Sequence, residues 1–286
     1  MRFQNTKYTL VYVFIVLISL SYLCGCSNNN TIDSKYQDDK LLSSEDKIMS
    51  FNLAGFTETG KKKWEVEGES ANILDNIVNL TNIIGKAYGQ EIDVKLTADE
   101  GTFNRSTNDV HLQKNVVVVT TEGTRLTTDT LNWDAQNQIV KTDDTVKIEK
   151  ENLEAIGKGG EAHPQLKQAQ LKAEVMVNVK PNTVITCKGP LEVDYENNIA
   201  VFHNDVKVAD IKGDIYADEI TAYFDPKNKK IEKAIAIGNV RIIRGNNCSF
   251  SQKAEYYALT NKVVLTGEPK VELYPKGSQA EALPLN

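Results

Sequence analysis

The chain has 286 residues, a formal net charge of −6 at pH 7 and 25% charged residues. A net acidic protein has no general attraction for nucleic acid, and it repels anionic lipid headgroups at long range. We therefore expect any anionic ligand to be held by local contacts, and mainly by its apolar part. The length allows one large all-β domain or two small ones.

The first predicted element is the apolar stretch from Leu10 to Leu23, which follows a short positively charged start. The stretch is shorter than the ~20 residues that a bilayer core requires, so it predicts a secretion signal. The residues Leu23-Cys24-Gly25-Cys26 are typical of a bacterial lipoprotein cleavage site. They predict a signal peptide over residues 1–25 and a lipid on Cys26. The alternative is an uncleaved N-terminal anchor, and both place the following residues outside the cytoplasm and tethered to a membrane.

Residues 26–47 are polar and lack apolar periodicity, which predicts a lipidated flexible tether. If Cys26 carries the lipid, Cys187 and Cys248 remain as one pair in an oxidising compartment. A disulfide between them and two unpaired core thiols both stay open, because the sequence does not show whether the two strands face each other.

From Ile48 to Tyr274, apolar and polar residues alternate, as in Val206-Lys207-Val208 and Val240-Arg241-Ile242. This period of two predicts strands with one buried face. The stretch from Leu166 to Ala173 could be helical, but its continuation through Val175, Val177 and Val179 favours another strand.

The predicted strands form a loose internal repeat. Asp99 precedes Asn115-Val116, and Asp129 precedes Thr145-Val146, each member of the second pair lying thirty residues after its counterpart. Such short units must stack to bury an apolar face. We expect two strands and a turn in each unit, with the polar residue at the turn and the valine entering the next strand. The pattern returns at Asp205-Val206, Asn239-Val240 and Pro269-Lys270-Val271.

Two regions of the first half carry a family resemblance. Leu126 to Asp134 and Val140 to Val146 resemble the central signature of the LptC family of lipopolysaccharide-transport bridge proteins. Ala155 to Gly159 fits the C-terminal end of that family, and Trp64 to Gly68 fits its first strands.

The second half resembles the related LptA (OstA-type) domain. The residues that carry this resemblance include Gly189 to Tyr195, Gly238-Asn239-Val240 and Val264 to Pro269. The chain departs from the enteric LptC pattern, in which an uncleaved helix holds the protein and no second domain follows. We therefore expect an LptC-like β-jellyroll over 48–180, an LptA/OstA-like β-jellyroll over 181–275 and a polar tail over 276–286.

The resemblance implies an all-β fold of two consecutive, open, twisted, V-shaped β-jellyrolls. It also implies a groove that carries the acyl chains of lipopolysaccharide, and end strands that pair edge to edge with neighbouring jellyrolls. The implied partners are an inner-membrane ABC transporter and periplasmic bridge jellyroll proteins. The implied location is the periplasm, with a lipid anchor in the inner membrane, although Ser27 after the lipidated cysteine would permit export to the outer membrane by enteric sorting rules.

Strand alternation predicts which apolar side chains point inward and line the groove. A shift of one residue would turn the other set of side chains inward, and the sequence leaves this choice open for each strand. The last strands offer an unpaired edge, which we expect to be the docking edge. The predicted groove residues are Phe103, Val117, Val119, Leu131, Trp133, Ile148, Leu191, Val193, Phe202, Val208, Ile220, Phe224, Ile242 and Val264, and the predicted docking residues are Val263, Leu265, Val271 and Leu273.

The sequence contains no pattern of catalytic residues. His111, His163 and His203 are far apart and have no neighbouring ligand pattern, so we expect no metal and no cofactor. The resulting prediction is a lipid-transfer scaffold that is not an enzyme. Two alternatives stay open: a structural or adhesive envelope lipoprotein with a closed β core, and a carbohydrate-active jellyroll enzyme with a carboxylate pair in a cleft.

Overall fold

The computed structural model describes residues 46–57, 59–89, 93–163 and 166–274, and the predicted signal peptide, Cys26 and polar tail lie outside them. Among these residues no helix has the length and apolar character needed to cross a membrane. The all-β prediction is confirmed, and the stretch after Leu166 is a strand, as its continuation through alternating valines indicated. The strands are β1 (Asp46–Phe56), β2 (Lys62–Leu74), β3 (Ile77–Ala87), β4 (Val94–Asn104), β5 (Val110–Thr120), β6 (Arg125–Asp134), β7 (Ile139–Lys150), β8 (Leu153–His163), β9 (Gln168–Val179), β10 (Thr183–Cys187), β11 (Leu191–Asp194), β12 (Ile199–Asp210), β13 (Gly213–Phe224), β14 (Ile231–Arg244), β15 (Asn247–Tyr257), β16 (Lys262–Thr266) and β17 (Lys270–Glu272).

The chain divides into two compact units. The described residues of the N-terminal unit lie in 46–151 and 159–169, and those of the C-terminal unit in 152–158 and 170–274. The domain limits expected from the sequence stay a prediction.

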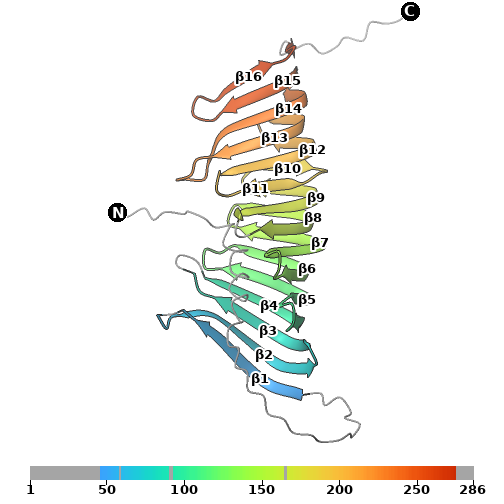
Figure 1. Cartoon of the computed structure of the whole chain (residues 1–286). Coiled ribbons are helices and arrows are strands. Elements are labelled where there is room, and N and C mark those ends of the chain that lie inside the picture. The colour runs from blue at the N-terminus through green and yellow to red at the C-terminus, as the bar shows by residue number, and fades with distance from the viewer. Residues whose placement is uncertain (1–45, 58, 90–92, 164–165, 275–286) are drawn as a thin grey trace, which may run out of the picture. The chain divides into compact units, whose positions relative to one another are not determined.

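In the N-terminal unit the strands pair antiparallel in chain order, from β1 with β2 to β6 with β7 (Figure 1). Short hairpins connect them, so each strand lies beside its sequence neighbours. Their register brings together residues of one kind: Leu96, Val118 and Leu126 are partners on three successive strands. Because all three are buried, the alternation of the sequence defines one buried face.

The C-terminal unit is built in the same way. β10 pairs with β9 and β12, β11 pairs with β12, and β12 to β15 follow in chain order, all antiparallel. At the end of the unit β15 pairs with both β16 and β17. Phe202, Ile220 and Ala236 are register partners on β12, β13 and β14, and all three are buried.

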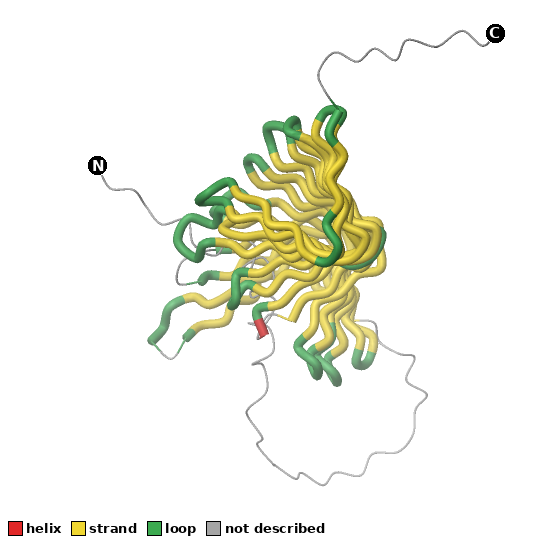
Figure 2. Tube along the Cα trace, turned by 90° about the horizontal axis from the view of Figure 1, so that it is seen from above, coloured by secondary structure: helices red, strands yellow, loops and turns green. Residues whose placement is uncertain are grey.

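Within each unit the strands bend near their middle, as the view from above shows (Figure 2). At the bend, adjacent residues take left-handed backbone conformations, with φ of 64° and 52° at Lys114 and Asn115 and 76° and 50° at Gly238 and Asn239. The strand register shifts at the same places, between Gln113 and Val116 and between Ile237 and Val240. These are β-bulges, which leave residues unpaired and bend the strand.

The predicted position of the repeated polar residues was therefore wrong. Asn115 and Asn239 lie in the middle of β5 and β14, and not at turns between strands. Asn and Asp tolerate the left-handed conformation in a mid-strand bulge as well as in a turn, so the residue type alone does not separate the two.

The valine that follows each bulge is fully buried. Val116 is 0% exposed, and Val206 and Val240 are each 1% exposed. The last repeat differs, because Val271 in β17 is 54% exposed. The bend therefore carries apolar residues that are among the most deeply buried of each unit, and in the final strand the equivalent residue is exposed.

Candidate functional site

The apolar face of the bent strands is the first candidate site. We define the inner face of each unit as the sheet face that carries the buried side chains. In the N-terminal unit it includes Leu112, Leu131 and Val140, and in the C-terminal unit it includes Leu191 and Ile242. Each such side chain gains roughly 1.5–3 kcal/mol when it leaves water, so the face is a strong attractor for acyl chains whenever it is accessible.

The structure places most of the predicted groove residues on this face. Register links the less buried of them to the buried ones: Phe103 pairs with half-buried Val110, which in turn pairs with buried Trp133. Their role in binding a lipid stays a prediction. On the inner face, Leu131, Trp133, Ile148, Leu191, Phe202, Ile220 and Ile242 are buried, and Phe103, Val193, Val208 and Phe224 are half-buried.

Three residues point the other way, and the inward orientation predicted for them was wrong. Val117 and Val119 alternate with buried Val116 and Val118, and are only half-buried. Val264 pairs with Glu255, whereas the neighbouring Leu265 pairs with buried Ala254. All three residues lie in uninterrupted apolar runs. In such a run no polar residue marks the outer face, so the sequence does not show which side chains point inward.

The polar residues of the repeat bridge neighbouring strands at the bend. Asn239 donates a hydrogen bond from Nδ2 to Asp218 Oδ2 over 2.9 Å. Lys188 Nζ lies 2.7 Å from Asp205 Oδ2, and Thr130 donates to Asp144 over 2.5 Å. These contacts hold bulges of adjacent strands in step. The sequence repeat revealed Asp205 and Asn239 but neither their partners nor this role.

A charged cluster lies on β2 and β3, centred on Glu65. Its carboxylate is buried and accepts hydrogen bonds from Lys62, from Lys86 over 2.6 Å and from the Tyr88 hydroxyl over 2.9 Å. These donors, Lys62 first, lower the pKa of Glu65 to about 2. The cluster is charge-matched and serves to fasten β2 to β3.

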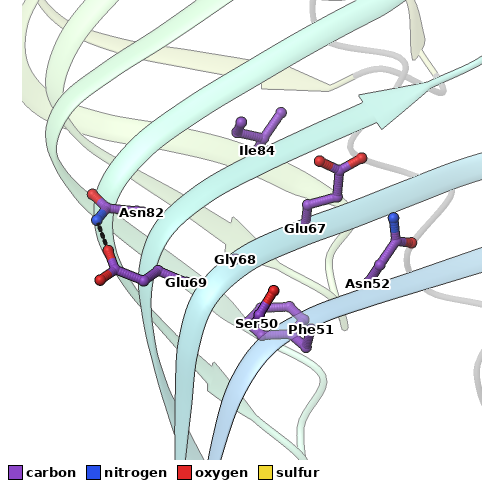
Figure 3. A pocket seen from close by; sticks show the side chains of 8 residues that line it. All are labelled: Ser50, Phe51, Asn52, Glu67, Gly68, Glu69, Asn82 and Ile84. Carbon is purple, nitrogen blue, oxygen red and sulfur yellow. Dashed lines mark hydrogen bonds between the residues drawn. The ribbon is translucent and has the colours of Figure 1, made fainter.

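A hollow of about 340 Å³ opens beside the bend of β1, β2 and β3 (Figure 3). Asn82 donates a hydrogen bond to Glu69 on one side of it. Gly68 is required there, because a Cβ would approach the ring of Phe51 to 2.4 Å. The lining is mainly polar and differs in character from the inner face; it consists of Ser50, Phe51, Asn52, Glu67, Gly68, Glu69, Asn82 and Ile84.

The outer strands of the units form a second kind of candidate site. β1 pairs with β2 and carries exposed Met49, Leu53 and Phe56. In the last strands of the C-terminal unit, Val263 and Leu265 are half-buried, and further along the chain Val271 and Leu273 are exposed. Apolar side chains on an outer strand favour pairing with another strand.

The two cysteines of the described chain do not form a disulfide. Both thiols are free: Cys187 is buried in β10, and Cys248 is half-buried in β15. β12, β13 and β14 separate them, so four strand spacings of about 4.8 Å exceed the ~7 Å Cα–Cα limit of a disulfide. Cys187 Sγ donates to the Gly189 carbonyl over 3.3 Å, and burial raises the pKa of this thiol.

No group of three or more His, Cys, Asp or Glu side chains suited to a metal ion occurs in the described part of the chain. The three histidines have separate local partners. His111 contacts Asn132, His163 contacts Glu161, and His203 lies between Glu192 and Glu219.

These features define an antiparallel β protein with bent strands, a buried apolar inner face and apolar outer strands. A family model described as "Lipopolysaccharide-assembly, LptC-related" matches residues 11–179, and the chain belongs to this family. A second model, "LptA/(LptD N-terminal domain) LPS transport protein", matches residues 190–283. No curated protein matches the chain.

The predicted combination of an LptC-family region with a following LptA/OstA-like region is therefore confirmed, as is the β-jellyroll class. Both families are lipopolysaccharide-transport bridge proteins of the periplasmic envelope, and neither is an enzyme family. The first match begins inside the apolar N-terminal stretch.

Proposed function

We propose that this chain is a membrane-tethered periplasmic scaffold that accepts lipopolysaccharide from an inner-membrane ABC transporter. It passes the lipid along its inner faces, by way of other bridge jellyrolls, towards the outer membrane. The observation that carries the proposal is the succession of apolar register partners on the inner face of both units, such as Leu96, Val118 and Leu126 in the first.

The physical need for such a face is large. Exposing an acyl chain to water costs ~0.8 kcal/mol per methylene, or about 10 kcal/mol for a chain of roughly twelve methylenes. An apolar face that stays in contact with the chain removes most of this barrier. The transporter supplies the work, so the scaffold needs no nucleotide site. Because many inner residues are buried, lipid entry requires the two arms of the bent strands to move apart.

The tether of this proposal is a lipid on Cys26 in the inner membrane. About twenty residues separate Cys26 from β1. A flexible chain of that length spans about 25 Å on average. This reach holds the first strands close to a membrane-bound transporter.

A second candidate function is a structural envelope protein whose inner faces form a closed core. The near-complete burial of Leu126 and Val140 favours it. The two candidates differ in whether lipid reaches the inner face.

Photo-crosslinking in cells tests the proposal. A crosslinking residue at Phe103, Trp133, Phe202 or Phe224, all on the inner face, should capture lipopolysaccharide. Asn132 and Tyr223 are matched outward controls, since each is the sequence neighbour of an inner position and should not be labelled. Equal labelling of inner and outer positions, or no capture at any inner position, contradicts the proposal and favours the closed core.

A further inference from the structure

Trp133 carries a buried hydrogen-bond donor that has no acceptor. The side chain is 3% exposed on the inner face of β6, and its Nε1 has no hydrogen-bond partner among the described residues. Its register partners are Val110 on β5 and Val140 on β7. Their side chains are hydrocarbon and cannot accept a hydrogen bond.

Such an arrangement is costly. A buried donor without an acceptor loses about 1–3 kcal/mol, and nearly all buried polar groups in folded proteins are paired. A trapped water needs two to four polar partners, which the valines do not offer. A phenylalanine would bury a similar ring without the unpaired N–H. A ligand that enters the inner face would supply the missing acceptor.

We infer that the indole N–H of Trp133 donates a hydrogen bond to an acyl carbonyl oxygen of the bound glycolipid, where an ester or amide joins the chain to its sugar. This inference rests on the proposed function, because it concerns the lipid carried on the inner face. It assigns Trp133 a role in recognising acylated lipids, in addition to its apolar contact.

The position of Trp133 along β6 fits this chemistry. The bend of β6 lies between the buried residues Thr128 and Leu131. Trp133 is three to four residues further on, or about 10–13 Å at ~3.3 Å per residue, and the strand ends at Asp134. Acyl chains directed at the deeply buried bend would place their carbonyls near the end of the arm. The polar turn that begins at Asp134 then lies next to the sugar.

Trp64 is a matched control within the same unit. It is the second of the two tryptophans and is also buried on the inner side of its strand. Its indole packs against Gly55, where a Cβ would lie 2.2 Å from Nε1. Its nitrogen is not one of the buried atoms without a partner. Replacing either tryptophan by phenylalanine removes one indole N–H, but of the two nitrogens only that of Trp133 is both fully buried and without a partner among the described residues.

The test uses the full chain in nanodiscs made of ether-linked phospholipid, which contains no acyl carbonyl. With ¹⁵N-labelled tryptophan, the two indole N–H resonances are assigned from the Trp64→Phe and Trp133→Phe variants. Addition of lipopolysaccharide should move the Trp133 N–H proton resonance downfield, as a new hydrogen bond requires, and should move that of Trp64 less. Trp133→Phe should weaken lipopolysaccharide binding roughly 2- to 10-fold, the equivalent of one hydrogen bond of about 0.5–1.5 kcal/mol. Because a phenylalanine ring is smaller than an indole, the urea midpoint of each variant is measured beside its affinity to separate lost stability from lost binding.

The outcomes separate the two claims. If wild-type protein does not bind lipopolysaccharide, the proposed function fails. If it binds but the Trp133 resonance stays in place, the inferred hydrogen bond is absent even though the function stands. This resonance is measured on wild-type protein, so the conclusion does not depend on whether Trp133→Phe folds. Equal affinity of Trp64→Phe and Trp133→Phe also overturns the inference.

Discussion

Asn115 donates a hydrogen bond from Nδ2 to Asp99 Oδ2 over 2.6 Å, joining the bulge of β5 to the bend of β4. The same contact recurs in the C-terminal unit between Asn239 and Asp218, on β14 and β13. Both asparagines take left-handed backbone conformations, and both precede a fully buried valine. The amide therefore fixes the bulge that turns the valine inward, and the two units use one local device to bend the sheet.

Replacing Asn115 should destabilise the N-terminal unit in an order set by the backbone. Asn115→Ala loses the hydrogen bond and places a Cβ-bearing residue at a φ of 52°, at a combined cost of roughly 2 kcal/mol. Asn115→Gly loses the bond but tolerates the conformation, so it should cost about 1 kcal/mol or less. Urea unfolding measures both. Equal losses for alanine and glycine would show that left-handed strain plays no part.

The repeat also predicts a contrast between two valines. Val240→Ala removes methyl groups from a position that is 1% exposed and should cost roughly 1–3 kcal/mol. Val271→Ala, at the corresponding place in the last repeat, changes a side chain that is 54% exposed and should cost no more than about 0.5 kcal/mol. The measurement is the urea midpoint of each variant. A large loss at Val271 would mean that the last strand is buried in solution, by a partner or a second copy.

The sequence predicted the strands well because most alternate between apolar and polar residues, as in Val206-Lys207-Val208. It failed where the alternation stops: in Val116 to Val119 every residue is apolar, and the inner face could not be chosen. It also could not place the bend, because Asn115 is equally suited to a turn. The unpaired nitrogen of Trp133 depends on the valines of two neighbouring strands, which only the register reveals.

Glu65 should make the stability of the N-terminal unit depend on pH. Its pKa in the folded chain is about 2, lowered mainly by the hydrogen bond from Lys62, against an ordinary value of 4.5. A lowered folded pKa gives a stabilisation that is complete above pH 4.5 and is lost as the pH falls towards 2. Glu65→Gln should therefore have a lower urea midpoint than wild type at pH 7. This gap between the two midpoints should narrow as the pH falls from 4.5 to 2. The exposed Glu232→Gln is the control, with no gap expected. A gap that stays constant over this range would rule out the carboxylate as its cause.

The lipid anchor gives a prediction for the N-terminal region. Cys26→Ser should leave an unprocessed precursor, because the lipid is attached before the signal peptide is cleaved. The readouts are gel mobility and the mass of the N-terminal peptide, with Cys24→Ser as a matched control that retains the acceptor cysteine. A mature wild-type N-terminus at any residue other than Cys26 would end the lipoprotein proposal, and unchanged mobility of Cys26→Ser would favour an uncleaved anchor.

The C-terminal strand should be a docking edge for another jellyroll. β17 pairs with β15, and Val271 lies opposite Ser249 while Glu272 lies opposite Cys248. Consecutive residues of a strand direct their backbone N–H groups to opposite edges of that strand. Of the two variants Val271→Pro and Glu272→Pro, one therefore removes a donor from the outer edge of β17. The other removes a donor that faces β15. The first should weaken association with the bridge partner while leaving the fold intact, and the second should loosen β17 itself.

Size-exclusion chromatography with the bridge partner measures the association, and circular dichroism checks the fold. Val271→Ala and Glu272→Ala keep the backbone donors and should associate like wild type, apart from a small loss at the apolar Val271. Edge pairing predicts that exactly one folded proline variant loses the partner, since only outward N–H groups reach a second chain. If both proline variants are folded and bind as strongly as wild type, the docking edge lies elsewhere. The exposed Met49, Leu53 and Phe56 on β1 then become the place to mutate.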